Sequence, residues 1–97
     1  MMYRLDENRE PVLEPDLIAW GDWFEAADRS VARTRVGEAV VSTVFLGIDH
    51  QFGLGPPTLF ETLILGGLGD GEGERYHTWA DAEAGHARWV AAIGGAS

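Results

Sequence analysis

The sequence predicts an α+β fold, a two-layer domain in which an antiparallel sheet of three to five strands packs against two helices. Two segments, 14–30 and 77–93, carry apolar residues at intervals of three and four, which is the spacing of a helix with one buried side. Between them, three segments rich in β-branched residues are bounded by turn residues and are typical of strands. This order of elements favours helices packed on a sheet, within one compact domain that covers residues 1–97.

A short hairpin is expected before the first helix. Tyr3 and Leu5 are separated from Val12 and Leu13 by a polar turn. Pro11 suits an edge position, because proline has no N–H to donate to a neighbouring strand. The sequence therefore begins with two short paired strands.

The first helix is expected to open at Pro15, because proline tolerates the first turn of a helix. Gly21 weakens this helix by up to ~1 kcal/mol relative to alanine. Its apolar stripe keeps the helical spacing, and its members are Leu17, Trp20, Phe24 and Ala27.

The strands are expected at 31–36, 39–48 and 58–65, with a short fourth strand at 74–78 after a glycine-rich loop. Segment 39–48 is almost entirely apolar. We therefore expect a central strand, covered on both faces or on one face plus a partner.

The last helix is expected to begin after Thr78, whose hydroxyl is a plausible N-cap with Asp81 three residues further on. At 100° per residue, Glu83 and His86 fall on the same side of this helix as its apolar residues. One core is predicted, with these members: Leu17, Trp20, Phe24, Val44, Leu46, Trp79, Val90 and Ile93.

Composition restricts the classes of function. Sixteen acidic residues against seven arginines and no lysine give a formal net charge of −9. Binding of nucleic acid or of an anionic membrane requires neutralisation of phosphates, so we expect neither as a partner. The absence of cysteine excludes disulfides and thiolate metal sites. The first ten residues lack the pattern of a signal peptide and no apolar run reaches the ~18 residues of a membrane span, so a cytoplasmic location is expected.

The candidate site is a set of acidic and histidine side chains near the ends of the predicted strands. Glu83 and His86 form a Glu-x-x-His pair on one helical side, which is also a spacing of metal ligands in helical bundles. Asp49 and His50 end one strand and Glu61 lies within the next, so all five could converge on one cleft. Such groups are competent as general acids, general bases or ligands of hard metals. The metal is left open, and the sequence requires no cofactor.

A structural role for each of these residues is the alternative. His86 would then be a core histidine hydrogen-bonded to Glu83 or to a carbonyl group, and Glu61 a cross-strand partner of Arg33 or Arg35. His50 would be a solvated loop residue.

The blocks "STVFLGIDHQF", "GPP", "LFET" and "TWADAEAGH" resemble, in order and spacing, a family of small proteins encoded in bacteriophage and prophage genomes. The resemblance extends from "YRLDENREPV" to the last helix. It implies a phage-encoded accessory protein acting in the cytoplasm of a bacterial host, and it carries no activity, fold or catalytic residues with it.

Three functions follow from these observations, in order of preference. The first is an interaction protein that blocks a host or anti-phage defence factor, whose partner is a host or phage protein with a basic surface. The second is a small enzyme or a metal- or ligand-binding protein that uses the five candidate residues. The third is a virion or assembly component. A homodimer remains open in each case.

Overall fold

The computed structural model describes residues 1–49 and 55–95, and in these ranges the chain has the predicted α+β fold. The elements are β1 (Tyr3–Leu5), β2 (Pro11–Leu13), α1 (Leu17–Ala26), β3 (Ser30–Val36), β4 (Ala39–Phe45), β5 (Phe60–Leu65), β6 (Gly73–Tyr76) and α2 (Trp79–Gly95).

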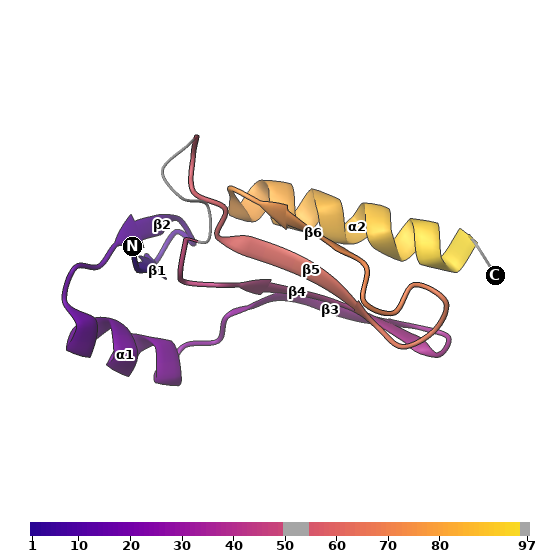
Figure 1. Ribbon diagram of the computed structural model, residues 1–97, viewed down its shortest axis with the longest axis horizontal. Helices are drawn as coiled ribbons and strands as arrows, with labels where there is room; N and C mark the ends of the chain where they lie inside the picture. The colour runs from indigo at the N-terminus through magenta and orange to yellow at the C-terminus, as the bar shows by residue number, and fades with distance from the viewer. Residues whose placement is uncertain (50–54, 96–97) are drawn as a thin grey trace.

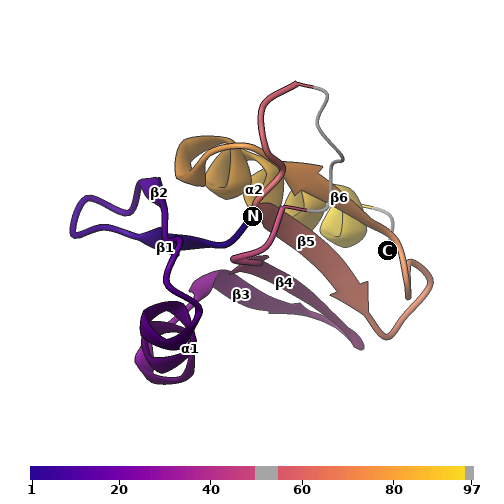
Figure 2. The ribbon, with the colours of Figure 1, turned by 60° about the vertical axis from the view of Figure 1, so that its left-hand side comes forward.

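The main sheet has the order β3-β4-β5-β6, and each strand runs antiparallel to the next. Helix α2 lies along one face of this sheet and contacts all four of its strands. Among the described helices and strands, the backbone of α1 lies close only to β1, and its Trp23 side chain reaches Phe45 of β4 (ring centroids 5.8 Å apart). Figures 1 and 2 show α2 against the sheet and α1 set apart beyond the strand ends, close to the β1–β2 hairpin. Among the described elements, one face of the sheet is therefore left without a helix.

The first helix begins two residues later than the sequence predicted. Asp16 caps it, because its carboxylate accepts hydrogen bonds from the N–H groups of Ile18 (3.0 Å) and Ala19 (3.2 Å). Pro15 precedes the cap. The prediction that Thr78 caps α2 is confirmed by a 3.0 Å hydrogen bond from the Asp81 N–H to the threonine hydroxyl.

The apolar strand predicted over 39–48 is shorter in the structure, where β4 ends at Phe45. Gly47 has φ 80°, a left-handed conformation that interrupts an extended strand. The Phe24 ring lies 3.1 Å from where a Cβ would stand on this glycine, so the close approach of α1 also requires glycine here.

The core consists of two clusters between the sheet and α2. The first cluster lies near the hairpin and has these buried members: Phe45, Leu59, Phe60, Tyr76 and Ala82. The second lies toward the C-terminal end of α2, and its buried members are Ala39, Val41 and Ile64. Buried Thr43 and Thr62 lie between them, since they occupy the intervening positions of β4 and β5. A polar layer therefore divides the core.

The predicted core is correct for the helix α2 and wrong elsewhere. Trp79, Val90 and Ile93 pack against the buried clusters as expected. Val44 lies on the opposite face of the sheet, because the odd-numbered residues of β4 are the ones that face α2. Leu17 is 64% exposed, since the inward side of α1 is formed by its aromatic residues.

Leu46, Trp20 and Phe24 are half-buried outside the two clusters. Leu46 lies just beyond the end of β4, and the rings of Trp20 and Phe24 pack on each other with centroids 4.6 Å apart. Among the described residues, no helix is long and apolar enough to cross a bilayer.

Candidate functional site

His86 is at the centre of the polar layer that divides the core. Its side chain is 6% exposed. Nε2 lies 2.8 Å from the Thr34 hydroxyl and Nδ1 lies 2.7 Å from the Thr43 hydroxyl, so both ring nitrogens are hydrogen-bonded. The expectation that His86 is buried and hydrogen-bonded is confirmed, although its partners are threonines of the sheet and not Glu83.

The network continues across the sheet to a tyrosine. The Tyr76 hydroxyl donates to Thr62 Oγ1 (2.9 Å), and Thr62 Oγ1 lies 2.6 Å from Thr43 Oγ1. Each hydroxyl has one proton to donate, so if Tyr76 donates to Thr62, then Thr62 donates to Thr43 and Thr43 donates to His86 Nδ1, which is the acceptor at the end of the series. Nε2 then carries the ring proton and donates a hydrogen bond to the Thr34 hydroxyl oxygen. This arrangement gives both ring nitrogens and each of the four hydroxyls at least one hydrogen bond.

Burial changes the protonation of both ends of this network. Desolvation lowers the pKa of His86 from its ordinary value of 6.5, because the imidazolium loses hydration. Desolvation likewise raises the pKa of Tyr76 above 10.0, a shift that its hydrogen bond to Thr62 opposes. Both side chains are therefore neutral at pH 7. A neutral layer in which every group is hydrogen-bonded at least once is the arrangement of a structural network.

The structure does not bring the predicted site residues into one cleft. Glu61 and His86 lie on opposite faces of the sheet, because Glu61 alternates with Thr62, which faces α2. The cross-strand partner of Glu61 is Arg75 of β6 at 3.0 Å, and the expected pairing with Arg33 or Arg35 is wrong because both lie on β3, two strands away.

The remaining predicted residues are separated as well. Asp49 lies past the end of β4, where its N–H donates to the Met1 carbonyl (3.2 Å). Glu83 is exposed on the flank of α2, because it lies at the edge of the helical side whose centre is buried. His50 falls outside the described residues. Within residues 1–49 and 55–95, no group of three metal-ligating side chains is close enough to hold a metal ion.

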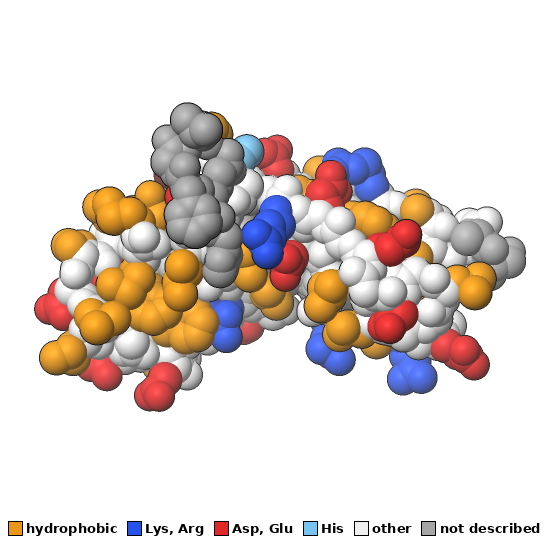
Figure 3. Space-filling view, viewed as in Figure 1, with side chains coloured by type: hydrophobic (Ala, Val, Ile, Leu, Met, Phe, Trp, Pro, Cys, Tyr) orange, Lys and Arg blue, Asp and Glu red, His pale blue; other side chains and the backbone are white. Residues whose placement is uncertain are grey.

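Two other surfaces emerge from the fold, and the first is the sheet face that α2 does not cover. We call it the open face; strand pairing assigns to it Arg33, Arg35, Val40, Ser42, Val44, Glu61, Leu63, Leu65 and Arg75. Apolar side chains also gather over α1 and the hairpin, at the left of Figure 3. The sequence did not predict the open face, because β4 has apolar residues on both of its sides and so does not show which side α2 covers.

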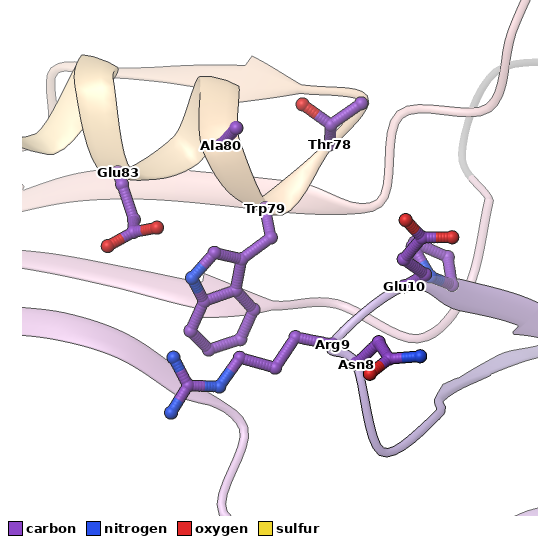
Figure 4. A pocket seen from close by; sticks show the side chains of 8 residues that line it. Asn8, Arg9, Glu10, Thr78, Trp79, Ala80 and Glu83 are labelled. Atoms are coloured by element: carbon purple, nitrogen blue, oxygen red, sulfur yellow. The ribbon is translucent and has the colours of Figure 1, made fainter.

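The second surface is a pair of adjoining hollows around Trp79, where the hairpin, the α1–β3 connection and the start of α2 meet. The hollows have volumes of about 480 Å³ and 370 Å³, and both are lined by Arg9, Trp79 and Glu83. The Arg9 guanidinium lies 4.8 Å from the Trp79 ring centroid. Figure 4 shows Arg9 alongside the indole and the Glu83 carboxylate on the side toward which the indole nitrogen points.

Two polar groups in these hollows have no partner in the part of the chain that the structure describes. The Trp79 Nε1–H is buried and has no hydrogen-bond acceptor among the described residues. The Glu83 carboxylate forms no hydrogen bond or ion pair with that part of the chain either. Three more acids line the two hollows: Asp6, Glu10 and Asp28. Sequence reasoning singled out Glu83 but missed Trp79 and Arg9, because an arginine in a polar turn carries no signal of stacking on a distant tryptophan.

Comparison with models of protein families, with curated proteins and with solved structures gives no match. The site must therefore be interpreted from its own geometry.

Proposed function

We propose that this chain is an interaction protein, and that the hollows around Trp79 bind a basic segment of a protein partner. The observation that carries the proposal is the combination, in one place, of a carboxylate and a buried indole N–H that both lack a partner within residues 1–49 and 55–95. A buried donor without a partner costs about 1–3 kcal/mol, and a bound ligand that supplies an acceptor recovers this free energy.

The charge of the hollows favours a cation. Four carboxylates and one guanidinium line them, which leaves a net charge of about −3 when all are ionised. Arg9 already lies on the Trp79 ring, and a guanidinium over an indole is stabilised by the negative potential of the ring face. An arginine or lysine side chain from a partner meets the same attraction together with the unpaired Glu83.

The indole N–H favours a peptide over a simple amine. A cationic side chain has only donors, so it satisfies Glu83 but leaves the Trp79 N–H without an acceptor. The carbonyl group of a peptide backbone provides that acceptor when the side chains that bury Nε1 move aside on binding. A basic peptide segment therefore satisfies both unpaired groups at once.

The resemblance to phage-encoded proteins supports a biological setting for this binding. An acidic accessory protein in the host cytoplasm can occupy a basic surface of a host or defence factor that would otherwise bind nucleic acid. Attraction between exposed charges of this kind weakens as the salt concentration rises.

The test is a titration of the ¹⁵N-labelled protein with a short arginine-containing peptide, followed by NMR. We expect the Trp79 indole N–H resonance, assigned through Trp79→Phe, to shift on binding, and binding to weaken in salt. Glu83→Gln removes one charge and should weaken binding by up to about fivefold, the value of about 1 kcal/mol for an accessible ion pair.

The matched control is Glu72→Gln, which removes an exposed acid from the β5–β6 loop, away from the hollows. Its binding should equal that of the wild type. An equal loss of peptide affinity in the two variants would show that binding depends only on net charge and would contradict a site at Trp79. A Trp79 indole resonance that does not shift on addition of the peptide would refute the site outright.

A further inference from the structure

The open face of the sheet does not match the charge of the chain that carries it. It holds Arg33, Arg35 and Arg75 against the single acid Glu61, a net charge of +2 in a protein of −9. Arg75 is paired with Glu61, whereas Arg33 and Arg35 are exposed and form no ion pair with any described residue. The face therefore offers two uncompensated cations.

Apolar side chains lie between these charges. Cross-strand pairs set Val40 beside Leu65, and Val44 beside Glu61. Leu63 and Leu65 are exposed, although both are large and lie in the middle of the sheet. An apolar surface bordered by charge on a sheet without a covering layer is typical of a protein interface.

A complementary surface exists elsewhere on the same chain. We call it the N-terminal patch; its exposed apolar residues are Met1, Leu13, Leu17, Ile18 and Ile48. The Met2–Ile48 bridge and the hydrogen bond from the Glu14 N–H to the Met2 carbonyl (2.9 Å) bring the segments that carry Met1, Leu13 and Ile48 together. The Trp20 indole N–H donates to the Tyr3 carbonyl (2.8 Å) and holds α1, with Leu17 and Ile18, beside them. Figure 3 shows apolar side chains gathered over α1 and the hairpin.

The charge of the N-terminal patch is opposite to that of the open face. Segment 13–28 has no arginine and five acids, which are Glu14, Asp16, Asp22, Glu25 and Asp28. Asp22 and Glu25 are exposed on the outer side of α1, next to Ile18, which is 76% exposed. An apolar and acidic surface thus matches an apolar and basic one.

The two surfaces do not meet within the described part of one chain, because α1 reaches the main sheet on the other face, where Trp23 packs against Phe45 of β4 (ring centroids 5.8 Å apart). The shape of the chain reflects this separation. Its radius of gyration is 14.2 Å, against ~12.5 Å for a compact domain of this length. Its accessible surface is 6071 Å², against ~5,500 Å² for a folded monomer of its mass. The excess is comparable to the ~800 Å² that each partner buries in a standard interface.

We propose that the occupant of the open face is a second copy of this chain, in a two-fold symmetric dimer in which the N-terminal patch of each copy packs on the open face of the other. Two-fold symmetry forms this contact twice, once in each direction. The α1 helix of each copy thereby packs on the sheet of the other, and the open face of each sheet is covered. Asp22 and Glu25 of each copy lie against Arg33 and Arg35 of the other. This dimer leaves the Trp79 hollows of each copy to a different partner, so it does not depend on the proposed function.

The experiment measures the mass of the intact chain by sedimentation equilibrium across the micromolar range. We expect twice the monomer mass of 10.6 kDa. Ile18→Asp should yield the monomer, and Leu68→Asp, at a fully exposed leucine of the β5–β6 loop, should remain dimeric as a matched control. Circular dichroism of both variants should match the wild type, because neither side chain is packed in the core.

Charge reversal gives the decisive arm. The variant Asp22→Arg with Glu25→Arg and the variant Arg33→Glu with Arg35→Glu should each be monomeric, since each sets like charges against one another in its own dimer. Mixed in equal amounts, they should form a heterodimer, because both contacts of the mixed pair then join opposite charges. A wild-type monomer at high micromolar concentration, or a mixture that stays monomeric, would overturn the dimer. Retention of the dimer by Ile18→Asp would exclude the N-terminal patch.

Discussion

Replacement of His86 by alanine should lower the free energy of unfolding by about 3–4 kcal/mol. The imidazole makes two hydrogen bonds to threonine hydroxyls, each with a net value of about 1 kcal/mol. Its removal also leaves a cavity between two apolar clusters, which adds about 1–2 kcal/mol. Thr43 keeps its bond to Thr62 and Thr34 is half-buried, so neither hydroxyl becomes a fully unsatisfied group.

The assay is thermal and urea denaturation followed by circular dichroism. For a domain of this size, 1 kcal/mol corresponds to about 4–8 °C, so the midpoint should fall by roughly 12–32 °C. His77→Ala is the matched control, because His77 is exposed and makes one hydrogen bond, to the Pro57 carbonyl (2.9 Å). Its midpoint should move by a few degrees at most.

Glu61→Gln separates a structural network from a shared functional site. The Glu61–Arg75 pair is partly exposed, and such pairs contribute about 0–1 kcal/mol, so this variant should melt close to the wild type. A His86→Ala protein that melts within about 5 °C of the wild type would refute the reasoning, because it would show that the polar layer contributes no stability.

Two further predictions follow from the core. The unfolding free energy should fall as the pH drops below about 6.5, because burial keeps His86 neutral in the fold while the unfolded chain takes up the proton. Measured against pH, the unfolding free energy should change with a smaller slope in His86→Gln than in the wild type. Equal slopes would contradict the assignment of this pH dependence to His86. Gly85→Ala should destabilise the protein despite the helix preference of alanine, because the new Cβ would overlap the Tyr76 ring. Gly21→Ala, with open space around it, should instead raise the unfolding free energy by about 0.5–1 kcal/mol. Chemical denaturation of the two variants tests this, and a Gly85→Ala protein as stable as the wild type would show that the Tyr76 ring does not lie against Gly85.

The sequence alone determined the local elements and their type. Periodicity of three to four identified α2, and the same pattern correctly oriented Trp79, Val90 and Ile93 toward the sheet. Turn residues and β-branched runs identified the four strands, because these signals depend on neighbours in the chain. Thr78 was recognisable as a cap for the same reason.

Only the tertiary structure decided which side of each strand is buried and which distant groups meet. Residues 39–45 of β4 have apolar side chains at both odd and even positions, so the sequence does not show which of its two faces packs against α2. Val44 was therefore assigned to the wrong face. The buried partners of His86 are threonines, whose polarity in a strand is no signal of a network. The open face, the N-terminal patch and the stacking of Arg9 on Trp79 likewise depend on contacts between segments far apart in sequence. Such contacts are fixed by strand register and by the packing of α2, which no local pattern specifies.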